Sequence, residues 1–273
     1  MPPLPLDQIA VVALIGLFAG LIGGLAGVGG SVFILPALHI VFSPILFGEP
    51  TDLQIHHLYM AAGMTVNVAV SLPAAIQHHR EGAVRTSLLR ILIPITAVGT
   101  IGGVLISNVI PGETLRVALA GFLILYCVWN LSIIARPRRR AFSGTGRVEN
   151  ATPMRLSISG GLTGILGGIL GLGGGFLLVP LLQIVSNLRL KNAIATSSAV
   201  LCVTAAIGAI LKLATLPQHN ESISHAMVYI ACMAPTGVIG ALLGAKWLHH
   251  MPVTAVRLVM TLLILAAATR LLV

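Results

Sequence analysis

The stretch GLIGGLAGVGGSVFILPAL, residues Gly20–Leu38, returns later in the chain as GILGGILGLGGGFLLVPLL, residues Gly164–Leu182. Both copies place a glycine cluster inside an apolar run, GVGG at 27–30 and GLGGG at 171–175. At one constant offset, Gly16, Gly20, Gly23, Gly24, Gly27, Gly29, Gly30, Pro36 and Leu38 match Gly160, Gly164, Gly167, Gly168, Gly171, Gly173, Gly174, Pro180 and Leu182. Because a proline and a leucine fall in register with the glycines, the pattern indicates a duplicated half rather than chance glycine richness.

The composition indicates an integral membrane protein. Of the 273 residues, 56% are hydrophobic and only 8% are charged, whereas a soluble domain carries about 25% charged residues. Apolar runs of about 20 residues recur along the chain, and unbroken runs of this length predict membrane-spanning helices rather than barrel strands. The fold class we expect is therefore an all-α, polytopic transmembrane bundle with the lipid bilayer as its surroundings.

The net charge of +9 has its explanation in membrane topology. Basic residues in short loops orient a membrane protein, since loops rich in Lys and Arg stay on the cytoplasmic side. Aromatic residues make up only 4% of the chain, so the sequence offers no base-stacking surface and we expect no nucleic acid partner.

Two repeats and a linker account for the whole chain. Residues 1–135 form the first repeat, 136–156 a basic cytoplasmic linker, and 157–273 the second repeat. Each repeat combines one glycine-broken segment with three ordinary spans. The expected segments are 8–47, 57–78, 87–107 and 114–134 in the first repeat, and 157–186, 193–214, 226–247 and 254–273 in the second.

Loop charges predict how the repeats are oriented. The linker and the loop at Arg80–Arg90 are rich in arginine, which places both inside, whereas 47–56 and 110–113 contain no Lys or Arg and suit the outside. In the second repeat, Arg189 and Lys191 lie inside and Leu216–His225, without Lys or Arg, lies outside. The second broken segment then starts and ends inside.

A segment that enters and leaves on the same side is a re-entrant hairpin joined at its glycines. The equivalent loops of the first repeat lie on the opposite face, so the halves are expected to be inverted repeats, as in many secondary transporters. The alternative is one broken crossing in each half, which gives eight spans in parallel repeats. It would put Arg189, Lys191 and Lys246 outside, against the charge rule.

The glycine clusters are the first candidates for a binding site. Glycine tolerates positive φ, and a helix broken there exposes N–H groups and the positive dipole end of the next helix. Two breaks that face each other would form an anion site near the midplane. The spaced glycines, such as Gly16, Gly20 and Gly24, instead fit close packing of helices.

Polar residues in the span after each break complete the candidate site, although hydroxyls also commonly bond to their own helix backbone. The predicted substrate-binding residues are Gly27, Gly29, Gly30, Ser31, Thr65, Asn67, Gly171, Gly173, Gly174, Gly175, Thr196 and Ser197. No carboxylate falls inside a predicted span, which disfavours a cation pump and fits an anion carrier. Lys212 and the other cations near span ends are expected to snorkel to the interface.

Other chemistry finds little support in the sequence. The histidines show no zinc-binding spacing, the three cysteines lie inside apolar runs, and no nucleophile motif is present. We therefore expect no cofactor, no metal and no enzyme. The number of subunits is not predicted.

At these motifs the chain resembles the sulfite exporter TauE/SafE family of bacterial membrane transporters. The resemblance covers nearly the whole chain and includes IATSS at 194–198 and HHREGAV at 78–84, besides the two glycine motifs. It implies a bacterial inner-membrane protein whose cargo is sulfite, a sulfonate such as sulfoacetate, or a related small organic anion. The chain departs from the family pattern at Gly63-Met64-Thr65, where Gly-Thr-Ser is common, and Ser31 stands where the second copy has Gly175. The two halves are therefore expected to contribute unequally.

The expected function is secondary transport of a small sulfur-containing anion, outward, because an anion leaves downhill when the inside is negative. Two alternatives remain open from the sequence. One is a carrier of another small anion, such as a carboxylate, in either direction. The other is a membrane-embedded enzyme or scaffold without transport.

Overall fold

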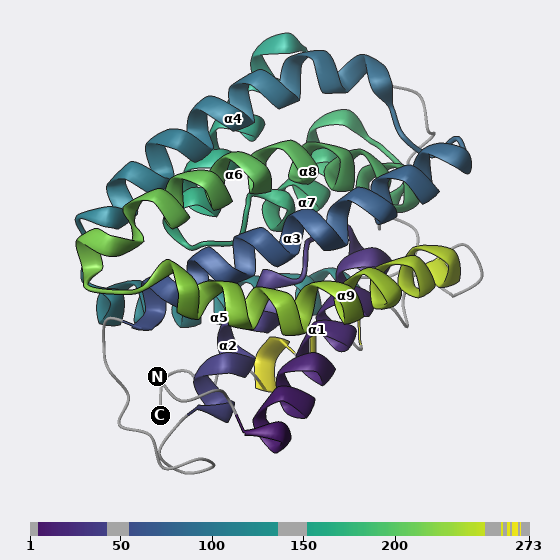
Figure 1. Cartoon of the computed structure of the whole chain (residues 1–273). Helices are drawn as coiled ribbons and strands as arrows, with labels where there is room; N and C mark the ends of the chain where they lie inside the picture. The colour runs from purple at the N-terminus through teal and green to yellow at the C-terminus, as the bar shows by residue number, and fades with distance from the viewer. Residues whose placement is uncertain are drawn as a thin grey trace.

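The computed structural model describes residues 5–42, 55–135, 152–248 and a few positions between 258 and 268. Within these residues the chain is all-helical, and the expected all-α bundle is confirmed (Figure 1). The helices are α1 (Leu6–Ala26), α2 (Ser31–Val41), α3 (Ile55–Arg80), α4 (Thr86–Asn108), α5 (Gly112–Ala135), α6 (Pro153–Ile169), α7 (Gly175–Ser186), α8 (Leu190–Thr215), a short 3-10 helix (Leu216–His219) and α9 (Ile223–Leu248). Residues 43–54, nearly all of the linker and most of the last expected span lie outside the described residues.

The helices have the lengths and surfaces of a multi-pass membrane protein. Among the described residues, six helices are long and apolar enough to cross a bilayer. Large apolar side chains face outward, including Val98, Leu125 and Ile210, each more than 60% exposed. By contrast, α2 and α7 have only 11 and 12 residues. At 1.5 Å per residue they are roughly 17 Å long, about half of the hydrocarbon core.

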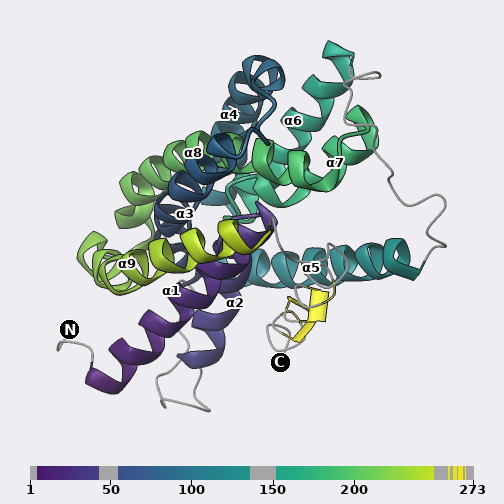
Figure 2. The ribbon, with the colours of Figure 1, turned by 90° about the vertical axis from the view of Figure 1, so that its right-hand side faces the viewer.

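The chain reverses direction at each glycine cluster. Helix α1 ends at Gly27, which has φ +64° and whose N–H bonds to the Gly23 carbonyl. A Cβ placed on Gly30 would lie 3.2 Å from the Cβ of Ala19, eleven residues earlier, and one on Gly174 would lie 3.3 Å from the carbonyl oxygen of Thr163, again eleven residues earlier. Each short helix therefore folds back along the helix before it, as α2 beside α1 and α7 beside α6 (Figure 2). Each broken segment is a hairpin and not a single crossing.

Each hairpin packs its first helix against the other half of the chain. Helix α1 packs on α9, and α6 packs on α4. The expectation that the spaced glycines serve close packing is confirmed, because a Cβ on Gly20 or Gly24 would overlap the main-chain oxygen of Gly237 or Ala241. At the equivalent positions, Gly164 and Gly168 meet the oxygens of Thr96 and Thr100. The partners advance together by four residues, so both helix pairs are parallel.

The central helices α3 and α8, each 26 residues long, pack against one another in opposite directions. His57, near the start of α3, lies 3.1 Å from the Lys212 ammonium near the end of α8. At the other end, the Asn192 amide near the start of α8 donates to the Ala83 carbonyl just after α3, at 2.9 Å. Loops 81–85 and 187–189 therefore share one end of the bundle, and turns 109–111 and 216–222 share the other.

Candidate functional site

The two glycine breaks meet between α3 and α8. Positive φ values between +64° and +87° occur at Gly27, Gly29, Gly171, Gly173 and Gly174, where a side chain would strain the backbone. A Cβ on Gly175 would lie only 3.2 Å from the carbonyl oxygen of Gly27. The two glycine breaks are thus in direct contact, and a side chain on Gly175 would fit only if its neighbours shifted.

Asn67 joins the two breaks from its position at the middle of α3. Its side-chain oxygen accepts the Ser31 N–H at 2.8 Å, and its amide donates to the Ser31 hydroxyl at 2.7 Å. The same amide donates to the Leu172 carbonyl of the second break at 3.3 Å. Asn67 and Ser31 are completely buried, so these bonds are made away from water and hold both hairpin tips to α3.

Ser197 joins the breaks from α8. Its hydroxyl lies 2.9 Å from the Gly27 carbonyl and 2.9 Å from the Gly175 carbonyl, so one donor serves both tips. Thr204, which was not among the predicted site residues, donates to the Gly173 carbonyl at 2.6 Å. The signal that could have found Thr204 is its spacing, since seven residues after Ser197 is two helical turns and the same helix face.

The two halves place different residues at equivalent points of the site. A Cβ on Gly29 would meet Leu201 at 2.8 Å and Asn67 at 2.9 Å, and a Cβ on Gly173 would meet the same two side chains at 2.8 and 3.4 Å. Asn67 and Leu201 therefore take corresponding positions on α3 and α8. The first half therefore carries the polar pair Ser31 and Asn67, which bond to each other. The second half carries the apolar pair Gly175 and Leu201 at the corresponding positions.

The remaining predicted residues have other contacts. The Thr65 hydroxyl donates to Ala61 in its own helix at 2.8 Å, which is the alternative that the sequence left open. The Thr196 hydroxyl accepts the Arg85 N–H at 3.1 Å, at the end of α3 rather than at the breaks. Gly30 and Gly174 face the first helix of their own hairpins, and Gly171 faces the Met60 side chain. The residues that come together are Gly27, Gly29, Ser31, Asn67, Gly173, Gly175 and Ser197.

The chemistry of this group is that of hydrogen-bond donors without a charged side chain. Side chains on α3 and α8 donate to the carbonyls of Gly27, Leu172, Gly173 and Gly175. Helices α2 and α7 both begin here, and the first N–H groups of a helix have no partner within it and carry the positive end of its dipole. In the described part of the chain, no three His, Cys, Asp or Glu side chains lie close enough to hold a metal ion.

The chain is similar over most of its length to a known protein family and to several membrane proteins. The family model described as sulfite exporter TauE/SafE matches residues 12–271. The chain is similar to the probable membrane transporter protein YdhB of Bacillus subtilis, with 27% identity over 243 residues, covering 89% of this chain and 91% of the relative. It is also similar to the probable membrane transporter protein YunE of the same bacterium, with 23% identity, covering 93% of this chain and 94% of the relative.

A longer relative has the same region within a larger chain. The probable membrane transporter protein MamO of Magnetospirillum gryphiswaldense is 25% identical over 274 residues, which cover 89% of this chain but 42% of the relative. No solved structure gives a significant match. The family match over nearly the whole length and the spanning helices lead to one conclusion: the chain belongs to the sulfite exporter TauE/SafE family and is a multi-pass membrane transporter, not an enzyme.

Proposed function

We propose that the protein is a secondary transporter that exports a small sulfur-containing anion, such as sulfite or an organosulfonate, across the bacterial inner membrane. The observation that carries this proposal is the meeting of the two hairpin tips, bridged by Asn67 and Ser197. The family supports transport, and the donors at the tips favour an anion. A sulfite or sulfonate group offers three oxygens that can accept hydrogen bonds from the starts of α2 and α7.

Alternating access follows from an inverted-repeat arrangement, which we propose for residues 1–135 and 157–273. The opposite directions of α3 and α8 support it. The packing of each hairpin's first helix against the other half also supports it, since α1 packs on α9 and α6 packs on α4. These glycine contacts are too close to open easily, and each pair moves as a unit. Rocking at the α3–α8 contact then exposes the tips first to one side and then to the other.

The same proposal fixes the orientation of the molecule in the membrane. The arginine-rich linker 136–156 is cytoplasmic, and the end of the bundle with loops 81–85 and 187–189 faces the cytoplasm with it. The turns 109–111 and 216–222 face outward. Export then needs no coupling ion, since a negative interior drives an anion outward.

Reconstitution in liposomes tests the proposal. We expect saturable sulfite flux by the wild-type protein and a loss of at least tenfold in Asn67→Leu, which places at position 67 the residue found at the equivalent position 201. Thr65→Val is the matched control, because Thr65 lies half a turn away on α3 and bonds only to its own helix. Carboxylate flux without sulfite or sulfonate flux would assign the alternative cargo. Sulfite flux that survives Asn67→Leu unchanged would remove the proposed site.

A further inference from the structure

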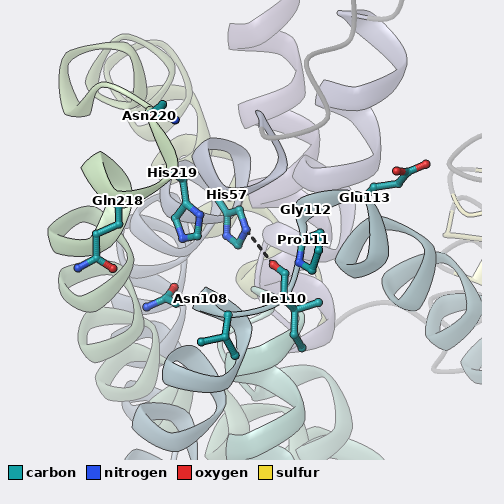
Figure 3. Close-up of a pocket in the computed structure, with 10 residues that line it drawn as sticks. His57, Asn108, Ile110, Pro111, Gly112, Glu113, Gln218, His219 and Asn220 are labelled. Atoms are coloured by element: carbon teal, nitrogen blue, oxygen red, sulfur yellow. Dashed lines mark hydrogen bonds between the residues drawn. The ribbon is translucent and has the colours of Figure 1, made fainter.

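A second polar site lies at the end of the bundle with turns 109–111 and 216–222. A pocket of about 450 Å³ opens there, lined by His57, Asn108, Gln218, His219, Asn220 and the turn 109–113 (Figure 3). His57 precedes Asn67 by ten residues on α3, which separates the pocket from the glycine breaks by about 15 Å along the helix. The pocket is therefore not part of the site described above.

A buried lysine lies behind the pocket wall. The expectation that Lys212 snorkels to the interface is wrong, because its side chain is only 1% exposed. The ammonium instead donates to the Asn108 side-chain oxygen at 2.8 Å and to His57 Nδ1 at 3.1 Å. Because His57 accepts at Nδ1, its Nε2–H donates to the Ile110 carbonyl at 3.2 Å, and the imidazole is neutral.

Neither partner of Lys212 carries a negative charge. A buried ammonium that has only neutral partners is costly, and an anion bound beside it would offset that cost. Arg116, in the first turns of α5, adds a second positive charge at the same end of the bundle. Charged groups within membrane-spanning helices usually mark a path for a substrate or an ion.

The pocket lining itself offers hydrogen-bond donors. The rings of His57 and His219 stack with centroids 3.7 Å apart, side by side in Figure 3, and His219 Nε2 is buried without a partner among the described residues. Gln218 and Asn108 carry amides at the wall. Helix α5 starts at Gly112, so its first N–H groups and positive dipole end are at the pocket. The carboxylate of Glu113 lies at the edge and points away from the two imidazoles (Figure 3).

We propose that this pocket is a binding site for a small oxyanion, held by the charge of Lys212 and the donors of His219, Gln218 and the start of α5. The pocket is larger than a sulfite or sulfate ion, so the anion binds with part of its water. The inference goes beyond the proposed function, since binding here does not depend on transport. If the protein exports anions, the site is where they leave the bundle.

Equilibrium dialysis with ³⁵S-labelled sulfate and sulfite tests this site in the purified full-length protein. The measurement is made in the Asn67→Leu background, which removes the side chain that bridges the two glycine breaks. We expect Lys212→Met to weaken binding of both anions at least tenfold, and Lys212→Arg to keep it within threefold. The control is Lys246→Met, because Lys246 is an exposed lysine near the end of α9 and we expect no change.

Two further measurements keep the test decisive. His219→Leu changes the pocket lining outside the helical core and is expected to weaken binding in the same way, should Lys212→Met fail to fold. Unchanged binding in both variants, or binding by wild type that disappears entirely in Asn67→Leu, would overturn the inference. Absence of flux for every small anion, with binding still lost in Lys212→Met, would instead overturn the proposed function and leave this site standing.

Discussion

Replacing Asn67 by leucine should reveal what the polar pair in the first half contributes. The substitution removes three hydrogen bonds, which leaves the Ser31 N–H and the Leu172 carbonyl without partners in a buried place. An unsatisfied buried group costs about 1–3 kcal/mol. Side-chain hydrogen bonds measured inside membrane proteins average only about 0.6 kcal/mol, because the unfolded reference finds partners too. Between these limits we expect Asn67→Leu to lower the free energy of unfolding by about 2 kcal/mol.

The second half suggests a compensating change. Gly175 and Leu201 occupy the positions that correspond to Ser31 and Asn67, so the double variant Ser31→Gly with Asn67→Leu copies a pair that this chain already contains. Glycine at position 31 removes the hydroxyl that Asn67→Leu leaves without its donor. We expect the double variant to recover about 1 kcal/mol of the loss, while sulfite flux stays low because no polar pair is restored.

Unfolding in mixed detergent micelles, followed by circular dichroism, gives the stabilities, and proteoliposome flux gives the activity. The reasoning fails if Asn67→Leu is as stable as wild type. It fails equally if the double variant is less stable than Asn67→Leu alone, since the Gly–Leu pair would then not be an equivalent of the Ser–Asn pair. Recovery of flux in the double variant would show that the pair holds the structure and does not bind the anion.

Two other predictions rest on single contacts, and a third tests the proposed orientation in the membrane. Thr204→Val keeps the side-chain shape but frees the Gly173 carbonyl, and should lower the free energy of unfolding by about 1–2 kcal/mol in the same titration. Gly29→Ala should lower the free energy of unfolding by about 1–2 kcal/mol because of the φ of +80° alone, and further because the new Cβ would overlap the Leu201 side chain. Its control is Gly102→Ala in α4, where a Cβ would meet open space, so the free energy of unfolding should stay unchanged or rise. In a background without native cysteines, Ser222→Cys should react with an impermeant thiol reagent from outside only, and Met154→Cys from the cytoplasm only; the reverse pattern would refute the orientation.

Much of the fold could be predicted because membrane physics leaves few choices. Length and hydropathy placed the described helix ends within about four residues of those expected, except that α2 ends at Val41 and the first broken segment was expected to reach 47. The repeated glycine clusters, with the charges of Arg189 and Lys191, predicted a hairpin, and the chain does turn back at Gly27 and at Gly171–Gly174. Whether the halves are inverted as loop charges predict stays a proposal, although α3 and α8 run in opposite directions.

The sequence could not reveal which helices pack together. Stripes of small residues such as Gly16, Gly20 and Gly24 predict close contact but not the partner, and that partner is α9 in the other half. The sequence also does not show which group a hydroxyl bonds to. Thr65 and Ser197 both follow a glycine break, but Thr65 bonds to its own helix and Ser197 to the Gly27 carbonyl. The burial of Lys212 was not predicted, because a lysine near a span end normally reaches water.

The balance of donors and acceptors at the breaks supports the proposal of an anionic cargo. A broken helix inside a membrane exposes carbonyls at the end of one segment and N–H groups at the start of the next, so it could serve either sign of charge. Here the carbonyls of Gly27, Leu172, Gly173 and Gly175 already accept hydrogen bonds from side chains. Asn67, Ser197 and Thr204 donate to them, and all three lie on the two helices that cross between the tips. The starts of α2 and α7 bring the positive ends of two helix dipoles to this point. The carboxylates among the described residues, Asp7, Glu81, Glu113 and Glu221, lie near other helix ends, so the breaks lack the charged ligands that a cation would need.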